Sequence, residues 1–384
     1  MAENRRIHLT TLKLTDFRNF ATLKLETGPE HIVLTGENGA GKTNLLEAVS
    51  FLSPGRGIRR ATYDTVARHD GPGTWSVHAE LEAAAGPVEI GTGLSASHLG
   101  VDTQRQTRIN ATKVRSGDEL LDHLRVVWLT PAMDGLFTGP ASERRRFLDR
   151  LVLAIDPAHG RRVSDFEKSM RARNRLLGEE NPDTGWLDAI ENQMSEAGVA
   201  IALARLELTS LLTGVIVRSS DPASPFPDAH LALEGALDAN AADGAAAADI
   251  ENEYRDRLAA QRRLDAAAGR TLEGPHRSDF RVSHRPKSMP AENCSTGEQK
   301  ALLVGILLAH AQLVKDLNGH APVMLLDEIA AHLDSGRRAA LFDRIDELDC
   351  QAWMTGTDRP LFDALGRRAQ YFTVDSGTVG KDAK

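Results

Sequence analysis

One short stretch decides the fold of this chain: Gly36-Glu37-Asn38-Gly39-Ala40-Gly41-Lys42-Thr43. It matches the P-loop pattern GxxxxGK(S/T), in which glycines let the main chain wrap around a phosphate with its amide N–H groups pointing inward. The apolar run His31–Thr35 precedes it, and Asn44–Leu52 follows with apolar residues at helical spacing. Strand, turn and helix together predict an α/β fold in which a helix N-terminus faces an anion.

Each part of this loop has an expected role in binding a nucleotide. We expect the whole loop from Gly36 to Thr43, together with Asn44, to contact the phosphates. Lys42 would neutralise charge on the β- and γ-phosphates and is therefore a candidate catalytic residue, whereas the Thr43 hydroxyl would ligate Mg²⁺. An accidental glycine-rich turn is the alternative, and the flanking strand and helix argue against it.

A second motif lies in the C-terminal part, where Val323-Met324-Leu325-Leu326-Asp327-Glu328 forms an apolar strand ending in two carboxylates. This is the Walker B arrangement. Asp327 would hold Mg²⁺ directly or through water, and Glu328 would polarise the attacking water as a general base. Alone the motif is moderately specific, because many buried strands run into a polar loop. Paired with the P-loop, it predicts ATP and Mg²⁺ as cofactors.

A third motif, Ser295-Thr296-Gly297-Glu298-Gln299-Lys300, stands just ahead of a strongly apolar helix and resembles the ABC signature. In ABC ATPases the signature of one subunit contacts the γ-phosphate held by the P-loop of another. The resemblance therefore implies that Ser295, Gly297 and Glu298 bind nucleotide in an ATP-dependent homodimer. Ser295 with Glu298 three residues on also fits a helix capping box, and both interpretations can hold together.

Two positions depart from the usual ABC pattern. Thr355-Gly356-Thr357-Asp358 follows the last strand, where many ABC ATPases carry a switch histidine, and no Q-loop glutamine stands near Val127–Thr130. Both departures suggest slow hydrolysis, with ATP used as a switch. His332-Leu333-Asp334 occupies the place of a D-loop, although Asp334 could equally cap the following helix.

The middle of the chain has a different character from its two ends. Helical spacing dominates there, for example from Trp186 to Ile216, while Asp221–Ile250 reads as loops and short strands. We predict an ABC-type head built from residues 1–130 and 273–384, and a mostly helical arm domain at 131–272. Strand-like patterns in the N-terminal part include Trp75–Leu81, Val88–Leu94 and Ile109–Val114.

Further motifs, in their order along the chain, resemble those of the RecF family of ABC/SMC-type ATPases. They look like that family's FRN(Y/F), NLLEA, SPGR and GPHR(D/S)D stretches and its entry into the arm. The matching residues are Thr15–Phe20, Asn44–Ala48, Ser53–Arg56, Gly139-Pro140, Arg144–Asp149 and Gly274–Asp279. The resemblance spans nearly the whole chain and is weakest at Asp221–Ile250.

This resemblance implies an SMC-like head with a short helical arm and a weak, DNA-stimulated ATPase. It also implies binding to duplex and gapped DNA, and loading of RecA together with RecO and RecR in repair, replication restart and the SOS response. An ABC transporter subunit or a fused nuclease fits less well, because the transporter signals and the room for a nuclease domain are missing. Another ABC/SMC-like ATPase, such as a chromosome-associated clamp reset by hydrolysis, stays open.

The sequence itself says less about DNA. A net charge of -8 argues against a basic coat over the whole protein, so DNA contact should be local and salt-sensitive. Few aromatic residues, 5% of the chain, argue against base stacking as the main binding mode. Clusters of arginine and lysine are more often solvated faces than binding sites. The candidate DNA contacts are Arg56, Arg59, Arg60, Arg105, Arg108 and Lys113, and a further cluster is Arg144–Arg146.

The remaining features concern the compartment. Cys294 and Cys350 are far apart and form no zinc motif, which fits a reducing cytosol. Met1–Lys13 lacks the apolar block of a signal peptide. The longest apolar stretch, Ala301–Val314, is shorter than the roughly 18 residues of a membrane span. We expect a cytoplasmic, nucleoid-associated protein without a membrane.

Overall fold

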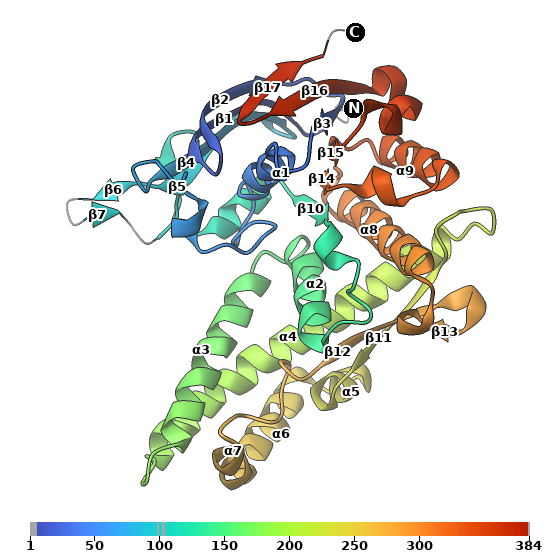
Figure 1. Cartoon of the computed structure of the whole chain (residues 1–384). Coiled ribbons are helices and arrows are strands. Elements are labelled where there is room, and N and C mark those ends of the chain that lie inside the picture. The colour runs from blue at the N-terminus through green and yellow to red at the C-terminus, as the bar shows by residue number, and fades with distance from the viewer. Residues whose placement is uncertain (1–5, 98–99, 102–103, 383–384) are drawn as a thin grey trace. The chain divides into compact units, whose positions relative to one another are not determined.

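The computed structural model describes residues 6–97, 100–101 and 104–382, and the chain forms two compact units (Figure 1). The first unit comprises Met1–Asp134, Asp221–Phe226 and Leu303–Lys384, and the second comprises Gly135–Ser220 and Pro227–Leu302. Compact units are not the same as independently folding domains. The expected division into 1–130, 131–272 and 273–384 therefore stays a prediction.

One of the two large sheets of the first unit is antiparallel, in the order β2-β1-β4-β5-β8-β9. Its strands alternate buried and exposed residues, so one face packs on the core and the other faces solvent. The strands are β1 (His8–Phe17), β2 (Phe20–Glu26), β4 (Trp75–Ala83), β5 (Gly86–Leu94), β8 (Gln106–Ile109) and β9 (Thr112–Lys113). The short pair β6 (Ala96–Ser97) and β7 (Gly100–Val101) forms a separate ribbon.

The strand expected at Ile109–Val114 is wrong in one respect, because the chain reverses within it. Asn110 and Ala111 have φ of 47° and 64°, the left-handed conformations that a two-residue hairpin turn requires. Arg108 on β8 consequently lies opposite Lys113 on β9. The strands expected at Trp75–Leu81 and Val88–Leu94 are confirmed as β4 and β5.

The other large sheet of the first unit carries the predicted motifs. Its order is β10-β14-β15-β3-β16-β17, and all neighbours are parallel except β16 and β17. Strands buried on both faces read as continuous apolar runs, as at β14. The strands are β3 (His31–Thr35), β10 (Val126–Leu129), β14 (Val323–Leu326), β15 (Ala352–Gly356), β16 (Ala369–Asp375) and β17 (Thr378–Lys381).

Two whole helices, most of a third and several 3₁₀ turns lie in the described part of the first unit. Helix α1 (Lys42–Ser50) follows β3, and α9 (Ser335–Glu347) follows β14. The 3₁₀ segments are Tyr63–Val66, Gly117–Asp122, Pro131–Met133, Ile329–His332 and Arg359–Arg368. The core of the unit includes an aromatic group in which Trp75 lies 5.7 Å from Phe17 and 5.0 Å from Phe51, measured between ring centroids. Trp75 also donates a hydrogen bond from Nε1 to the carbonyl of Tyr63, 2.7 Å away.

The second unit is mostly helical, as expected, but it also contains a three-stranded sheet in the order β11-β12-β13. The helices are α2 (Ala141–Leu153), α3 (His159–Leu177), α4 (Thr184–Arg218), α5 (Ala236–Ala242), α6 (Ala247–Ala260) and α7 (Arg262–Ala268). The strands are β11 (Ala229–Glu234), β12 (Asp279–His284) and β13 (Met289–Pro290), with 3₁₀ turns at Arg285–Lys287 and Ala291–Asn293. Helix α8 (Thr296–Asn318) begins in this unit and ends in the first.

A buried charged cluster holds the helices of the second unit together. Arg173 on α3 has no exposed surface and donates to Glu191 on α4 at 2.8 Å and to Asp265 on α7 at 2.6 Å. Its remaining donors reach the Thr271 hydroxyl and the Leu258 carbonyl. Removing one partner of such a cluster would leave a buried charge without compensation.

Two helices are long and apolar enough, by length and composition, to cross a membrane: Thr184–Arg218 and Thr296–Asn318. Of their most apolar windows, 50% and 67% respectively are buried inside the protein, as in the core helices of globular units. At the start of α4 one aromatic side chain is exposed, since Trp186 keeps 63% of its surface accessible.

Candidate nucleotide-binding site

The P-loop connects β3 to α1, as the sequence predicts, and two glycines make its path possible. Gly36 has φ of 145°, and a Cβ atom there would lie 2.2 Å from the carbonyl oxygen of Val374. Gly41 has φ of 117°, and a Cβ atom there would lie 2.5 Å from the side chain of Asn19. Only glycine fits both positions. The turn thus delivers the chain into α1 at Lys42, with the helix N-terminus at the loop.

Lys42 is buried and lies across the loop that precedes it. Its Nζ donates to the carbonyl oxygens of Gly36 at 2.6 Å and Glu37 at 2.9 Å. These contacts place a positive charge at the centre of a loop whose amide groups form an anion-binding cradle. The arrangement suits the phosphate chain of a nucleotide.

The two predicted motifs meet at the carboxyl ends of the parallel strands. Thr43 Oγ1 lies 3.0 and 3.2 Å from the two carboxylate oxygens of Asp327, which follows β14. Thr355, at the end of the neighbouring β15, donates from Oγ1 to Asp327 Oδ1 at 2.8 Å. Burial raises the pKa of Asp327, while the hydrogen bonds from Thr355 and Thr43 act in the opposite direction.

Glu328 is held in an uncommon main-chain conformation beside Asp327. Its φ and ψ are 51° and 19°, and its N–H donates to Thr355 Oγ1 at 2.8 Å. A left-handed conformation at a residue other than glycine costs free energy and persists only where the surroundings enforce it. One threonine therefore fixes both carboxylate residues, the one expected to bind metal and the one expected to act as base.

Thr355 was not among the residues that sequence reasoning selected for catalysis. It belongs to the segment where a switch histidine was expected and missing. The signal that could have identified it is its place at the end of a strand next to the Walker B strand, because the carboxyl ends of neighbouring parallel strands meet at one edge.

The donor set fits Mg²⁺ rather than a metal enclosed by protein. No group of three or more His, Cys, Asp or Glu side chains with metal-binding geometry occurs among the residues that the structure describes. Mg²⁺ usually keeps several waters and is bound through one or two protein oxygens plus substrate phosphates. The hydroxyl of Thr43 and the carboxylate of Asp327 supply oxygens of that kind, already side by side.

A polar network supports the P-loop from outside. Asn19 Nδ2 donates to the carbonyl of Ala40 at 3.0 Å, and Asn44 Nδ2 donates to Asn19 Oδ1 at 2.7 Å. Arg59 then donates to Asn44 Oδ1 and to Glu47 Oε2, both at 2.6 Å. Arg59, a candidate DNA contact, is thus tied to the loop that would hold the nucleotide.

Glu47 is the centre of this network. It is completely buried on α1 and accepts two hydrogen bonds from Arg18, at 2.8 and 2.6 Å, besides the one from Arg59. Arg18 has φ of 55°, so another residue of this site has a left-handed main chain. Two guanidinium groups neutralise the buried carboxylate and bring the segment after α1 to the P-loop.

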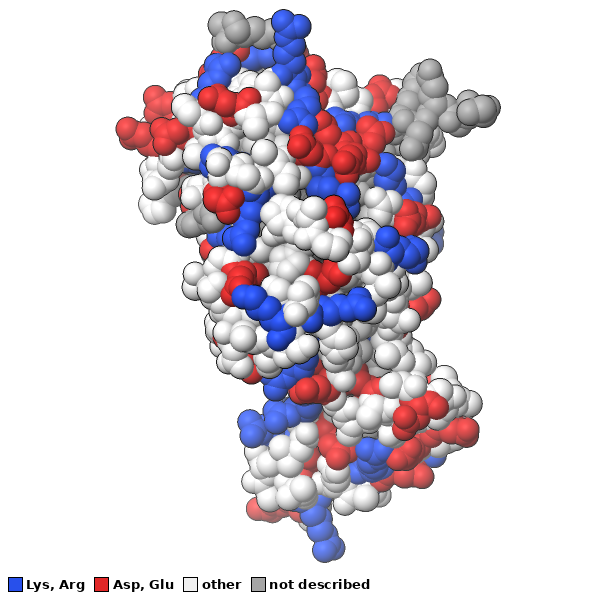
Figure 2. Space-filling model, turned by 90° about the vertical axis from the view of Figure 1, so that its right-hand side faces the viewer, with Lys and Arg blue, Asp and Glu red and all other residues white. Residues whose placement is uncertain are grey.

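The basic residues expected at DNA fall into two groups. The guanidinium of Arg105 donates to the carbonyls of Phe51, Ser53 and Gly55, so it holds the turn after α1. Arg108 and Lys113 on the β8–β9 hairpin are exposed, and so are Arg56, Arg59 and Arg60. On the face drawn in Figure 2, basic and acidic side chains of the described residues are interspersed. DNA contact by these residues stays a prediction.

The third basic cluster is mainly structural. Arg144 is buried and makes a two-point ion pair with Asp279, at 2.7 and 2.8 Å. Arg145 donates to the carbonyl of Ser278 at 2.6 Å, and Arg146 pairs with Glu143 on its own helix. Arg144 and Arg145 thus join α2 to the start of β12 inside the second unit.

The signature segment belongs to the second unit and begins α8. Glu298 Oε2 accepts from the N–H of Ser295 at 2.9 Å and from its hydroxyl at 2.8 Å, while Ser295 Oγ lies 3.4 Å from the N–H of Glu298. The expected capping box is therefore present. Lys287 and the bonds from Ser295 lower the pKa of Glu298 to about 2, so this carboxylate is ionised at neutral pH. Nucleotide binding by Ser295, Gly297 and Glu298 stays a prediction.

Two further residues, Asp334 and His276, make structural contacts. Asp334 accepts from the N–H of Arg337 at 2.8 Å and caps α9, which is one of its two expected roles. His276 bonds to the carbonyl of Thr271 at 3.0 Å and packs against Phe166, with 5.7 Å between ring centroids. Burial lowers the pKa of His276.

A P-loop joined to a Walker B strand through a threonine and an aspartate, on a largely parallel sheet, defines an ABC-type ATPase head. Residues 8–379 match the RecF/RecN/SMC N terminal domain family. The DNA replication and repair protein RecF of Rhizobium meliloti (strain 1021) is 60% identical over 374 residues, covering 97% of this chain and 99% of that protein. RecF of Rhizobium rhizogenes (strain K84 / ATCC BAA-868) is 61% identical over 376 residues, covering 98% and 99%. The chain therefore belongs to the RecF family of DNA replication and repair proteins.

Solved structures agree on the fold. The recombination mediator protein RecF-ATPrS in the RecFOR pathway superposes with a TM-score of 0.85 at 23% identity, covering 100% of both chains. The Smc head domain of Pyrococcus furiosus with an extended coiled coil, bound to the C-terminal domain of ScpA, gives a TM-score of 0.53 at 15% identity, covering 98% of this chain and 96% of that chain. The expected SMC-like head is thereby confirmed.

Proposed function

We propose that this protein is an ATP-dependent DNA-binding protein of recombinational repair and replication restart. In this proposal ATP closes two copies of the chain into a dimer on gapped or duplex DNA. The dimer helps to load RecA together with RecO and RecR, and so supports the SOS response. Its place is the cytoplasm, in association with the nucleoid.

One observation carries the nucleotide part of the proposal: Thr43 and Asp327, 284 residues apart in sequence, lie within 3.0 Å of each other. A hydroxyl at the start of the P-loop helix and a carboxylate after the Walker B strand form the usual protein share of a Mg²⁺–nucleotide site. The solved structures of RecF-ATPrS and RecF-ATP in the RecFOR pathway, which share this fold, support the choice of nucleotide and pathway.

Each residue of the site would have its own role in binding or hydrolysing ATP. Thr43 and Asp327 would hold Mg²⁺, which when bound would neutralise negative charge on the phosphates. Lys42 would add a second positive charge at the same phosphates. Glu328, held by Thr355, would accept a proton from the attacking water. Because no histidine follows β15, we expect slow hydrolysis that resets the dimer.

Exposed basic residues of the first unit would bind the DNA backbone. Exposed Arg108 and Lys113 stand opposite each other on a hairpin and can meet neighbouring phosphates without reading sequence. Arg56 and Arg60 lie in the segment that Arg59 ties to the P-loop. This connection offers a physical route by which nucleotide and DNA binding affect each other.

The experiment measures DNA binding by fluorescence anisotropy with and without ATP and Mg²⁺, and molar mass by light scattering in the same buffers. The variants are Lys42→Met at the P-loop and Ser295→Arg at the signature. We expect wild type to dimerise and bind DNA only with ATP, and both variants to fail. DNA binding that ignores ATP, with no dimer at any nucleotide, would contradict the proposed cycle.

The variant Glu328→Gln tests whether ATP hydrolysis only resets the dimer on DNA. If hydrolysis only resets the dimer, this variant holds ATP, stays dimeric and keeps DNA bound longer than wild type. If it releases DNA as fast as wild type, hydrolysis is not the resetting step.

A further inference from the structure

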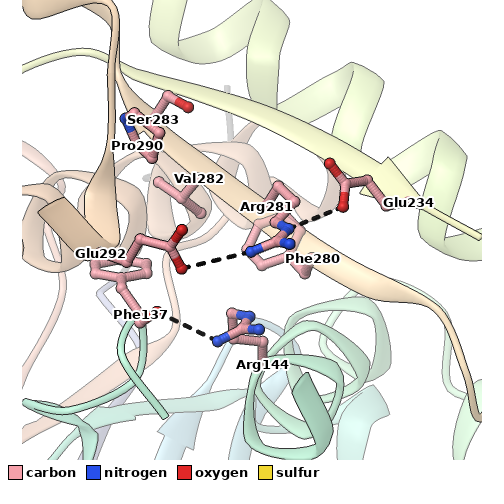
Figure 3. Close-up of a pocket in the computed structure, with 9 residues that line it drawn as sticks. All are labelled: Phe137, Arg144, Glu234, Phe280, Arg281, Val282, Ser283, Pro290 and Glu292. Carbon is pink, nitrogen blue, oxygen red and sulfur yellow. Dashed lines mark hydrogen bonds and ion pairs between the residues drawn. The ribbon is translucent and has the colours of Figure 1, made fainter. Parts of the chain in front are cut away.

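The hairpin formed by β12 and β13 leads directly into the signature segment and contacts it twice. Nearer its base, the Arg281 guanidinium lies 3.5 Å from the carboxylate of Glu292, in the 3₁₀ turn just before the signature (Figure 3). At its tip, the ammonium group of Lys287 makes an ion pair with Glu298, inside the signature itself. This second contact joins the signature to a part of the chain that the ATP-binding motifs do not include.

The tip of the β12–β13 hairpin holds Lys287 at a defined place. The 3₁₀ turn Arg285–Lys287 lies between the two strands. The N–H of Ser288 donates to the carbonyl of Arg285 at 3.1 Å, and Ser288 has φ of 48°, so the chain reverses directly after Lys287. A turn closed in this way fixes the main chain of Lys287 and limits where its ammonium group can reach.

Glu298, the partner of Lys287, is a charged residue of the capping box. Its carboxylate accepts hydrogen bonds from the N–H of Ser295 at 2.9 Å and from the Ser295 hydroxyl at 2.8 Å. With a pKa of about 2, it is ionised at neutral pH. These bonds stabilise the start of α8. They also place a negative charge beside the hydroxyl that is expected to meet the nucleotide.

This negative charge opposes the expected role of the signature. In the proposed dimer, Ser295 meets the γ-phosphate held by the P-loop of the other copy. The N–H groups at the start of α8 attract an anion, whereas the carboxylate of Glu298 repels it. Water leaves the interface as the dimer closes, and repulsion between like charges grows where the dielectric constant is low. A cation bound to Glu298 removes this repulsion, and Lys287 is placed to supply it.

We propose that Lys287 is a positioning residue of the signature, because it neutralises Glu298 and so allows the signature of one protomer to bind the phosphate held by the other. This inference rests on the proposed ATP-dependent dimer and adds the β12–β13 hairpin to the groups that control it. Lys287 acts through Glu298 and does not touch the nucleotide. Its side chain is half exposed, so the ion pair contributes little to the folding of a single protomer.

The test measures, by sedimentation velocity, the concentration of full-length protein at which half of the chains are dimeric with ATP and Mg²⁺. Lys287→Met removes the charge, and we expect it to raise this concentration at least fivefold. Lys287→Arg keeps the charge and should dimerise like wild type. At protein concentrations that saturate the dimer, ATP hydrolysis per protomer in Lys287→Met should equal that of wild type, because the loss lies in assembly.

Two measurements separate this role from a merely structural one. Thermal unfolding of Lys287→Met should match wild type, since the pair lies at the surface. Its affinity for a fluorescent ATP analogue, measured at protein concentrations too low for dimers, should also match, because the P-loop of the same protomer is unchanged.

Arg285→Met is the matched control for the loss of one positive charge. Arg285 belongs to the same 3₁₀ turn, and its side chain is exposed and makes no ion pair with any residue that the structure describes. This variant should dimerise like wild type. A double-mutant cycle gives the second control. Glu298→Gln keeps an oxygen for the capping box but carries no charge, so adding Lys287→Met to it should change dimerisation less than twofold.

Three results would each overturn the role of Lys287. They are equal dimerisation of wild type and Lys287→Met, an equal loss in Arg285→Met, and an undiminished loss when Lys287→Met is added to Glu298→Gln. If wild type forms no dimer with ATP, the proposed function fails and this inference fails with it. If wild type dimerises and Lys287→Met dimerises equally well, only this inference fails.

Discussion

Thr355 joins the two acidic residues of the candidate site, because its hydroxyl donates to Asp327 while accepting from the N–H of Glu328, both at 2.8 Å. The hydroxyl is fully buried and uses its donor and one acceptor position in these two bonds. No other side chain contacts both residues in this way among those described.

Thr355→Val keeps the shape of the side chain but removes both bonds. We expect a loss of about 1–3 kcal/mol in unfolding free energy, because a buried N–H and a buried carboxylate oxygen lose a partner. ATP hydrolysis should fall at least tenfold, while ATP binding through the P-loop changes less. Thr355→Ser is the control and should restore most of the rate. Unchanged hydrolysis in Thr355→Val would remove this residue from the site.

Arg105 and Arg108 come from one basic cluster but should behave differently. Arg105→Ala should lower the unfolding free energy by about 2–4 kcal/mol, because three carbonyls lose their donor. Arg108→Ala should unfold like wild type and bind DNA more weakly, with the slope of log K against log salt reduced by about 1. Denaturant unfolding and DNA titrations at several salt concentrations decide the matter. Equal stability of the two variants would contradict this division.

Arg59→Ala tests the link between the arginine segment and the P-loop. Asn44 and Glu47 each lose a bond, but Arg18 still neutralises Glu47. We therefore expect little loss of stability and a several-fold weaker affinity for ATP, measured by titration with a fluorescent ATP analogue. Arg56→Ala, in the same segment, serves as the control and should leave ATP affinity unchanged. Equal ATP affinity in both variants would mean that the network does not reach the nucleotide.

Acid stability should depend on Asp149 in the second unit. Burial raises the pKa of Asp149, but Arg205 and His159 together lower it from 3.8 to about 2. A carboxylate with a lowered pKa in the folded state stabilises it above the unfolded value, and this contribution disappears as pH falls from about 4 to 2. The shift corresponds to roughly 2 kcal/mol. Asp149→Asn should therefore flatten the acid limb of a urea-unfolding profile.

Asp165→Asn is a suitable control for that experiment. Asp165 pairs with Lys168 on the surface of α3, and both side chains are more than half exposed. Surface pairs of this kind contribute little, so the slope of stability against pH should stay that of wild type. Equal slopes in all three proteins would show that Asp149 does not titrate as described.

The predictions from sequence agree with the structure where a motif consists of residues close together in the chain. The P-loop, the Walker B strand and the capping box at Ser295 each depend on spacing over eight residues or fewer, and each is found as predicted. Local spacing fixes local geometry, so these motifs can be read directly.

Contacts between distant segments could not be read in the same way. Thr355 lies 28 residues from Asp327, and Arg105 lies 50 residues from Gly55. A basic residue that binds main-chain carbonyls and one that faces solvent look alike in a sequence. The short strands expected within Asp221–Ile250 include β11, but its pairing with β12 and β13, which come from the stretch before α8, was not predicted, because strand pairing between distant segments leaves no local pattern.

The exposed indole at the start of α4 has a spectroscopic consequence. The chain has four tryptophans, and Trp75, Trp128 and Trp353 in the first unit are at most 8% exposed, against 63% for Trp186 in the second. Emission from Trp186 should lie to the red of the rest and respond to iodide, whereas the other three should be shielded. The three buried tryptophans thus report on the first unit and Trp186 reports on the second, so one fluorescence experiment can follow the unfolding of each unit.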